Sequence, residues 1–155
     1  MTIKSTESGV TLRNRLSKSI VLAIRRLMQQ GSPNEESLDM AAFVTLALGK
    51  IEESVDLSAA AWEKRDYWLK ADHFRLEWAW AGQCRRALVP VLLLQDWPGI
   101  ARELIVVGQH LNSVQLSPNN RLGEPWHGAW LQFTGQNQLQ IAKEGVKAYL
   151  KSLWL

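Results

Sequence analysis

Residues 62–89 read WEKRDYWLKADHFRLEWAWAGQCRRALV, and this stretch decides the fold class. It contains no Pro and a single Gly, Gly82, deep in its interior. Because it lacks breakers and the alternation of a strand, we predict one continuous helix. Its apolar side chains define a heptad-spaced seam made of Trp62, Leu69 and Leu76, with Trp80 and Ala87 beside it.

Basic side chains line another side of this predicted helix. Lys64, Arg75 and Arg86 follow one another at intervals of 11 residues, about three turns, which stacks them in one stripe. Arg65 and Trp68 lie on or beside the stripe. The alignment requires that the helix be unbroken.

The first helix is predicted over residues 11–30 and is amphipathic. One face carries the apolar side chains Leu12, Leu16, Ile20, Ala23, Ile24 and Leu27. The opposite face carries the cations Arg15, Lys18, Arg25 and Arg26, with Leu22 among them. Gly31 suits a C-terminal cap. Such a basic face is either simply solvated or binds an anionic partner.

A second and longer helix follows. Ser32-Pro33-Asn34-Glu35 reads as a capping box with Pro at the first helical position. The apolar residues keep mainly helical spacing at Met40, Phe43, Val44, Ala47, Leu48, Ile51, Val55 and Leu57. Residues 58–62 contain no breaker, so we predict a helix well beyond average length.

The remaining chain is predicted to form shorter helices. Pro90 marks a kink or break, and Asp96 suits the N-cap of a helix that ends near Leu111. A short piece around residues 126–133 and a last amphipathic helix over residues 136–153 complete the chain. The prediction is therefore all-α: one domain over residues 1–155, with residues 1–9 flexible, forming a bundle of five or six helices of which one or two are long.

Composition predicts a cytoplasmic protein without membrane contact. The one cysteine, Cys84, has no partner for an internal disulfide. Residues 1–9 are polar and residues 11–26 are interrupted by cations, so no secretory segment is expected. The longest apolar run, residues 87–94, contains a proline and is far shorter than the roughly 20 residues that span a bilayer.

A search for catalytic chemistry finds no motif, and we predict no enzyme, cofactor or metal site. The histidines His73, His110 and His127 stand alone, without ligand partners at metal-binding spacing. Cys84 has no base near it in sequence, and no phosphate-binding glycine loop occurs. A small helical enzyme with an unrecognised site, using His73, Cys84 or Glu77, stays open as the third hypothesis.

Charge and aromatic content instead favour a binding protein. The net charge is +3, but residues 1–31 carry six cations against one acid, whereas residues 32–60 carry one cation against six acids. The chain has eight Trp beside three Phe and two Tyr, and Trp is enriched at interfaces. In residues 62–86 the cations alternate with Tyr67, Trp68, Phe74 and Trp78, a pattern that suits either nucleic acid or a packed helix whose cations cover apolar neighbours.

The block AWEKRDYWLKADHFRLEW, residues 61–78, resembles small helical proteins of type III CRISPR loci, notably cyanobacterial ones. The preceding AAFVTLALGKIEES, residues 41–54, is similar to the segment leading into that block. The sequence differs from the pattern at Asp66, where the family has a small residue, and at His73, where it has Arg. The resemblance covers about a quarter of the chain.

The resemblance implies a non-catalytic small subunit of an RNA-guided CRISPR ribonucleoprotein. Its implied partners are guide RNA and target nucleic acid, other effector subunits and further copies of this chain, with base pairing supplying sequence specificity. The implied backbone-contacting residues are Lys64, Arg65, Lys70, Arg75, Arg85 and Arg86, with Arg15, Lys18, Arg25 and Arg26 as a second patch. The alternative is a helical protein–protein adaptor or scaffold without nucleic-acid contact.

Overall fold

The structure is a computed structural model that describes residues 7–137. This part of the chain folds into five helices without a strand: α1 (Gly9–Met28), α2 (Glu35–Glu63), α3 (Trp68–Leu93), α4 (Trp97–His110) and α5 (Ala129–Gln136). The all-α prediction is confirmed, including two long helices of 29 and 26 residues. The predicted last helix over residues 136–153 lies almost entirely outside the described residues.

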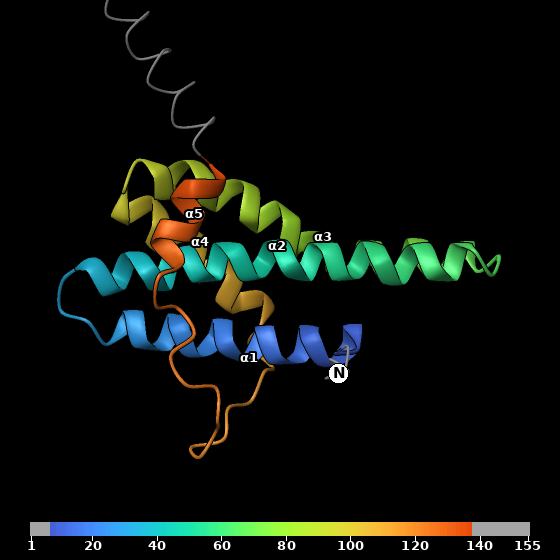
Figure 1. The fold of residues 1–155 in the computed structure, drawn as a ribbon, viewed down its shortest axis with the longest axis horizontal. Coiled ribbons are helices and arrows are strands. Elements are labelled where there is room, and N and C mark those ends of the chain that lie inside the picture. The colour runs from blue at the N-terminus through green and yellow to red at the C-terminus, as the bar shows by residue number, and fades with distance from the viewer. Residues whose placement is uncertain (1–6, 138–155) are drawn as a thin grey trace, which may run out of the picture.

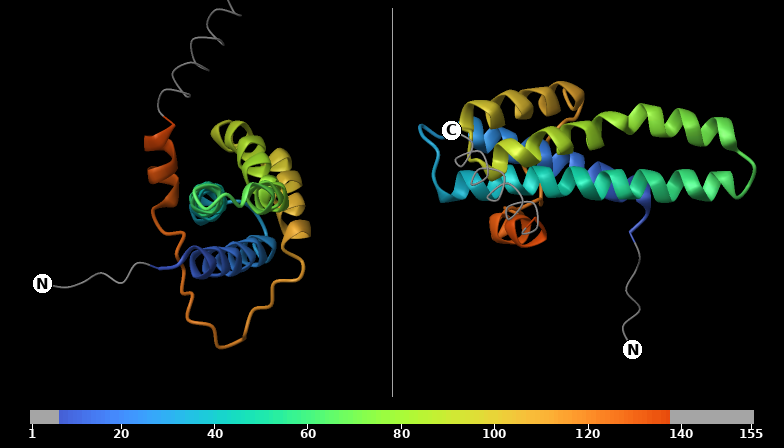
Figure 2. Two further views of the ribbon diagram at one scale, coloured as in Figure 1. Left: turned by 90° about the vertical axis from the view of Figure 1, so that its right-hand side faces the viewer. Right: turned by 90° about the horizontal axis from the view of Figure 1, so that it is seen from above.

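Helix α2 is the centre of the bundle and packs against α1, α3 and α5. Helix α3 runs back along α2 as an antiparallel hairpin, and α4 packs on α3 (Figure 2). The turn that joins α2 to α3 extends beyond the N-terminal end of α1 (Figure 1). The hairpin therefore has a packed half within the bundle and an end that projects from it.

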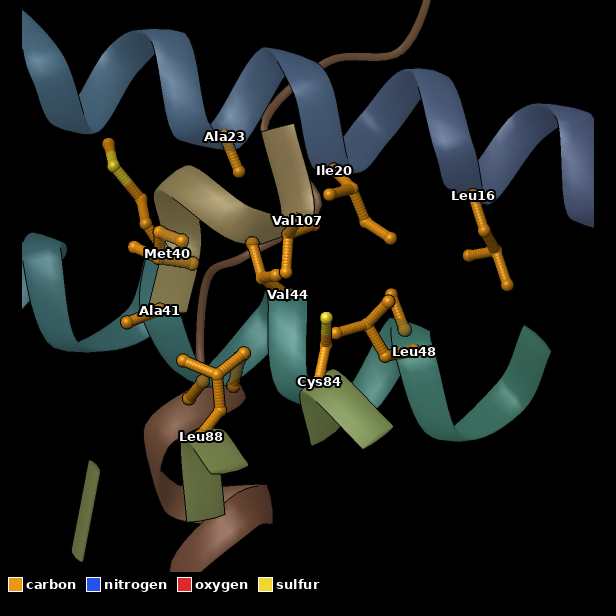
Figure 3. Close-up of a cluster of buried hydrophobic side chains, with 14 of the residues drawn as sticks. Leu16, Ile20, Ala23, Met40, Ala41, Val44, Leu48, Cys84, Leu88 and Val107 are labelled. Carbon is orange, nitrogen blue, oxygen red and sulfur yellow. The ribbon is translucent and has the colours of Figure 1, made fainter. Parts of the chain in front are cut away.

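The core lies between α1, α2, α3 and α4 (Figure 3). Its fully buried side chains include Ile20 from α1, Leu48 from α2, Leu88 from α3 and Val107 from α4. Within a helix the buried apolar residues recur at three- and four-residue intervals, as at Leu16, Ile20 and Ala23 in α1, which is expected of a helix with one buried stripe. The predicted core faces of the first two helices are confirmed except at Leu57, which is exposed.

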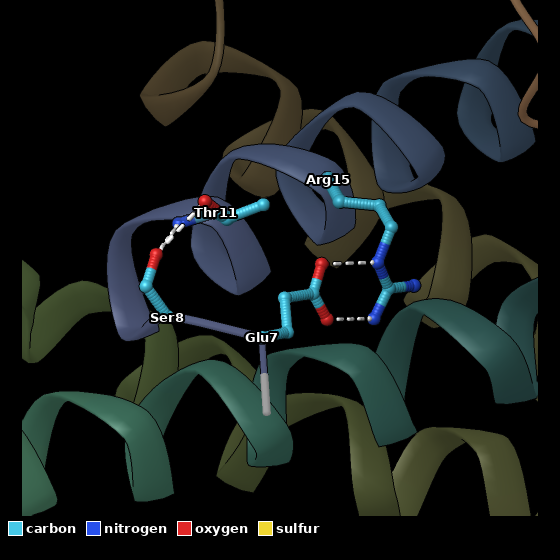
Figure 4. Close-up of polar contacts among 4 residues, drawn as sticks. All are labelled: Glu7, Ser8, Thr11 and Arg15. Atoms are coloured by element: carbon cyan, nitrogen blue, oxygen red, sulfur yellow. Dashed lines mark hydrogen bonds and ion pairs between the residues drawn. The ribbon is translucent and has the colours of Figure 1, made fainter. Parts of the chain in front are cut away.

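Side chains fix where α1 and α2 begin. Ser8 caps α1 by accepting from the Thr11 backbone N–H (Figure 4). Helix α2 starts two residues later than predicted, because Asn34 is its N-cap and exchanges capping-box hydrogen bonds with Ser37. Ser32 is not the cap, and Gly31 does not take the predicted left-handed cap position after α1, whose C-cap is Gln29.

The prediction of one unbroken helix over residues 62–89 is wrong. Helix α2 ends at Glu63 and α3 starts at Trp68. The Tyr67 N–H donates to the Trp62 carbonyl and the Asp66 N–H donates to the Glu63 carbonyl, the bond pair of a Schellman motif. Asp66 has φ of 63°, the left-handed conformation that terminates the helix. Asp tolerates this conformation, so no glycine is required.

Pro90 does not end α3, which continues to Leu93. The helix instead stops through a second Schellman arrangement: the Asp96 N–H bonds the Val91 carbonyl and the Gln95 N–H bonds the Leu92 carbonyl. Gln95 has φ of 50°. Asp96 then caps α4 by accepting from the Gly99 N–H, so the predicted cap is confirmed.

Helix α5 is fastened to α2 by a side chain. It lacks a side-chain cap of its own, and the Asp39 carboxylate accepts from the backbone N–H groups of Gly128 and Trp130 at 3.3 and 2.9 Å. The segment that precedes α5 passes over the outer side of α1 (Figures 1 and 2). Trp126, at the end of that segment, is fully buried.

Candidate nucleic-acid interface

Two of the predicted phosphate-facing arginines, Arg85 and Arg86, bind an acid of the neighbouring helix. Each lies 3.3 Å from a different carboxylate oxygen of Glu52 on α2. The carboxylate crosses α3 at Gly82, where a Cβ atom would overlap it, and the Arg85 side chain passes over Gly49. The two glycines thus allow this ion-pair cluster to form between α2 and α3.

Arg75 makes a similar connection nearer the projecting end of the hairpin. Its guanidinium pairs with Glu63 and lies 3.7 Å from Asp56, both on α2. The hydrogen bond that Arg75 donates to the Glu63 carboxylate raises the pKa of Arg75. Because α2 ends at Glu63, Lys64 does not continue a stripe through Arg75 and Arg86. The predicted alignment of these three cations is wrong, and both arginines face acids of α2.

The turn between the long helices carries a different set of side chains. Residues 64–70, here called the hairpin tip, are all exposed. They include Lys64, Arg65 and Lys70, for which the described part of the chain provides no carboxylate within ion-pair distance. Tyr67 and Trp68 lie between these cations, each 56% exposed. The tip also carries one acid, Asp66, so it combines three cations without an ion pair in this part of the chain, a net charge of +2 and two accessible aromatic rings.

Apolar side chains continue from the tip along the outer face of α3. Leu69 and Leu76 are 76% and 75% exposed, so the heptad-spaced seam predicted through these two residues does not pack against any part of residues 7–137. The Lys70 ammonium lies 4.6 Å from the centroid of the Trp62 ring, a cation–π arrangement that holds the side chain against the last turn of α2.

The second predicted patch, on α1, is only partly open. Arg15 forms a bidentate hydrogen-bonded pair with Glu7 (Figure 4), which lowers the pKa of Glu7 and raises that of Arg15. Arg26 lies 3.5 Å from Glu124 in the segment that crosses α1. Lys18 and Arg25 are exposed and have no ion pair recorded with the rest of residues 7–137.

A buried cation that the sequence did not reveal joins α1 to the hairpin. Arg13 is 5% exposed, and its Nη1 atom donates to the Ser54 hydroxyl at 2.7 Å and to the Ser58 hydroxyl at 3.3 Å. The guanidinium lies over the Phe74 ring, 4.8 Å from its centroid. Burial lowers the pKa of Arg13. Arg13 falls beside Leu12 and Leu16 on a helical wheel, and this position is the feature of the sequence from which its burial could have been predicted.

Of the residues suggested for catalysis, His73 and Glu77 are exposed and Cys84 is buried. Cys84 is buried in the core, and burial, with the nearby Glu103 carboxylate, raises the pKa of its thiol, opposite to the change that activates a nucleophile. Within residues 7–137, no three His, Cys, Asp or Glu side chains are placed to hold a metal ion. His127 contacts Glu124 at 2.8 Å and is exposed.

Comparison with known proteins adds no relative: the chain matches no protein-family model, no curated protein and no solved structure. None of the helices in residues 7–137 combines the length and the apolar character needed to span a membrane.

Proposed function

We propose that this protein is a non-catalytic, cytoplasmic subunit of an RNA-guided CRISPR ribonucleoprotein, and that the hairpin tip contacts the nucleic-acid backbone. The observation that carries the proposal is the composition of the tip: three cations that form no ion pair within residues 7–137 flank two exposed aromatic rings. Cations of this kind bind phosphates, and exposed rings stack on unpaired bases. The block of sequence that resembles CRISPR small subunits, residues 61–78, includes the whole tip.

The ion pairs of the other predicted arginines support the same site. Arg75, Arg85 and Arg86 are partly neutralised by acids of α2, so a phosphate would have to compete with those acids. At the tip, Lys64, Arg65 and Lys70 form no ion pair with a carboxylate of the described residues. The acids of α2 therefore stabilise the packing of α3 on α2, whereas the cations of the hairpin tip can bind a phosphate.

The test is RNA binding by the full chain, measured as fluorescence anisotropy of a labelled single strand at several salt concentrations. The variant Lys64→Glu/Arg65→Glu is compared with Arg102→Glu/Arg121→Glu, which makes the same charge change at exposed sites away from the tip. With three phosphate contacts, log K should fall against log salt with a slope of about −2.

Charge reversal of two of the three cations should remove about 1.4 units of that slope, at about 0.7 unit per lost phosphate contact on a single strand, whereas the control pair should retain it. The proposal fails if both double variants bind like the parent, or if both lose binding equally. The latter result would mean that only net charge matters.

A protein–protein adaptor is the second candidate, and an apolar groove between α1 and α4 favours it. The groove has a volume of about 570 Å³ and is lined by apolar residues that include Ile24, Leu27, Trp97, Leu104 and Ile105. The exposed Leu69 and Leu76 add apolar surface near the tip. Purified protein that carries no nucleic acid, judged by its 260/280 absorbance ratio, and a groove variant Ile105→Glu that no longer assembles with its partners would favour the adaptor.

A further inference from the structure

A second groove, distinct from the hairpin tip, lies between α1, α3 and the end of α4. Its volume is about 650 Å³, within the range of small-molecule sites. Polar side chains line most of it: Asn14, Ser17 and Lys18 from α1, and Ser113 and Gln115 after α4. This composition separates it from the apolar groove on the other side of α4.

One wall of this groove is a stack of three aromatic rings. The Trp80 and His110 rings are nearly parallel, with centroids 4.7 Å apart and planes inclined by 8°. Trp78 continues the stack, 6.0 Å from Trp80 at 27°. Both Trp side chains are half-buried and pack against the core, so the bundle holds the platform in place, while His110 is exposed.

We propose that this groove binds one unpaired nucleotide. A flat heterocycle would extend the ring stack at His110, because aromatic side chains are the usual platforms for splayed bases. Lys18, exposed and without an ion pair in the described chain, would meet the phosphate. The amide and hydroxyl groups of Asn14, Ser17 and Ser113 supply donors and acceptors for the base edge and the ribose hydroxyls.

Glu77 limits what the groove accepts. Its carboxylate also lines the groove and repels a second anion, which favours a single phosphate over a di- or triphosphate. Glu77 can accept from a base amino group or a ribose 2′-hydroxyl. This inference adds a base-binding site to the proposed function. It rests on the proposed function in one respect, that the bound nucleotide belongs to an RNA strand.

The test uses the three histidines of the chain as reporters. Adenosine 5′-monophosphate is titrated into the full-length protein while the imidazole proton resonances are followed by NMR. Stacking of the base should shift the His110 resonance in a saturable manner, while those of His73 and His127 stay in place. Ribose 5-phosphate, which has no ring to stack, serves as the control ligand.

The variant Lys18→Gln checks the phosphate contact. It should weaken adenosine monophosphate about two- to fivefold, the range of an exposed ion pair, and leave adenosine itself unaffected. Lys18 is exposed, so this variant should retain the fold. The inference is overturned if His110 does not shift, if all three histidines shift together, if ribose 5-phosphate has the same effect, or if Lys18→Gln leaves affinity for the monophosphate unchanged.

The two sites fail separately. The Lys64→Glu/Arg65→Glu protein should show the same His110 shift with adenosine monophosphate as the parent. A His110 response without RNA binding at the tip would refute the proposed function, whereas nucleotide binding in the groove would still be supported. RNA binding at the tip with a silent His110 would refute the groove alone.

Discussion

Glu52 is the residue through which the role of Arg85 and Arg86 is best measured. Substitution by Gln keeps the shape that fits over Gly82 but removes the charge that both arginines bind. The three side chains are partly exposed, so each ion pair contributes about 0.2–1 kcal/mol. Their joint loss should lower the free energy of unfolding by about 0.5–1.5 kcal/mol, or the melting temperature by about 1–6 °C for a chain of this length.

The neighbouring residue supplies a matched control. Glu53 is exposed and makes no ion pair within the described chain, so Glu53→Gln changes the net charge equally without touching the cluster. Urea unfolding followed by tryptophan fluorescence gives both free energies. If Glu52→Gln and Glu53→Gln have the same stability, the cluster does not join α2 to α3, and Arg85 and Arg86 return as candidates for phosphate contact.

Three further substitutions or measurements test other contacts. Ser54→Ala should cost about 1.5–3 kcal/mol, because it removes the acceptor 2.7 Å from the buried Arg13, whereas Ser19→Ala, equally buried on α1, should change stability by under about 0.5 kcal/mol in the same urea assay. Asp39→Ala should accelerate amide hydrogen exchange in α5 and leave α2 protected, since it removes the acceptor for two α5 backbone groups; equal acceleration in both helices would contradict this. Burial raises the Cys84 pKa, so iodoacetamide should label the folded protein far more slowly than the urea-unfolded protein. Above the ordinary thiol pKa of about 8.5 the unfolded state loses its proton first, and stability should fall as pH rises; a flat profile there would count against the shift.

The helices that sequence could predict are those with a periodic apolar face and a local cap. The core face of α1, the length of α2 and the Asp96 cap of α4 depend on residues within one or two turns of each other. Local rules are sufficient for such features.

The break between α2 and α3 could not be predicted in this way. Both long helices end with a non-glycine residue in the left-handed conformation, Asp66 and Gln95, so the sequence shows no glycine where each helix stops. Pro90, the one residue that suggested an interruption, lies within α3. The hydrogen bonds that stabilise the break are visible only in three dimensions.

The same limit applies to the candidate site. The uneven charge of the chain indicated that its parts separate by sign, but the pairing of Arg75 with Glu63 and of Arg85 with Glu52 depends on the antiparallel hairpin. A helical wheel of one segment cannot show a partner on another helix. Lys64, Arg65 and Lys70 lie at the end of that hairpin and form no ion pair within residues 7–137.

Photo-cross-linking tests the central claim about the hairpin tip most directly. The full-length protein is irradiated with a single-stranded RNA, digested with trypsin and mapped by mass spectrometry; cleavage after Arg65 and Lys70 releases Tyr67 and Trp68 in one peptide, residues 66–70. The account predicts that this peptide carries the principal RNA adduct. In Lys64→Glu/Arg65→Glu trypsin releases the same residues within a longer peptide, residues 51–70, and the adduct on Tyr67 and Trp68 in that peptide should be reduced. Adducts spread over the other aromatic residues, with none in residues 66–70, would contradict it.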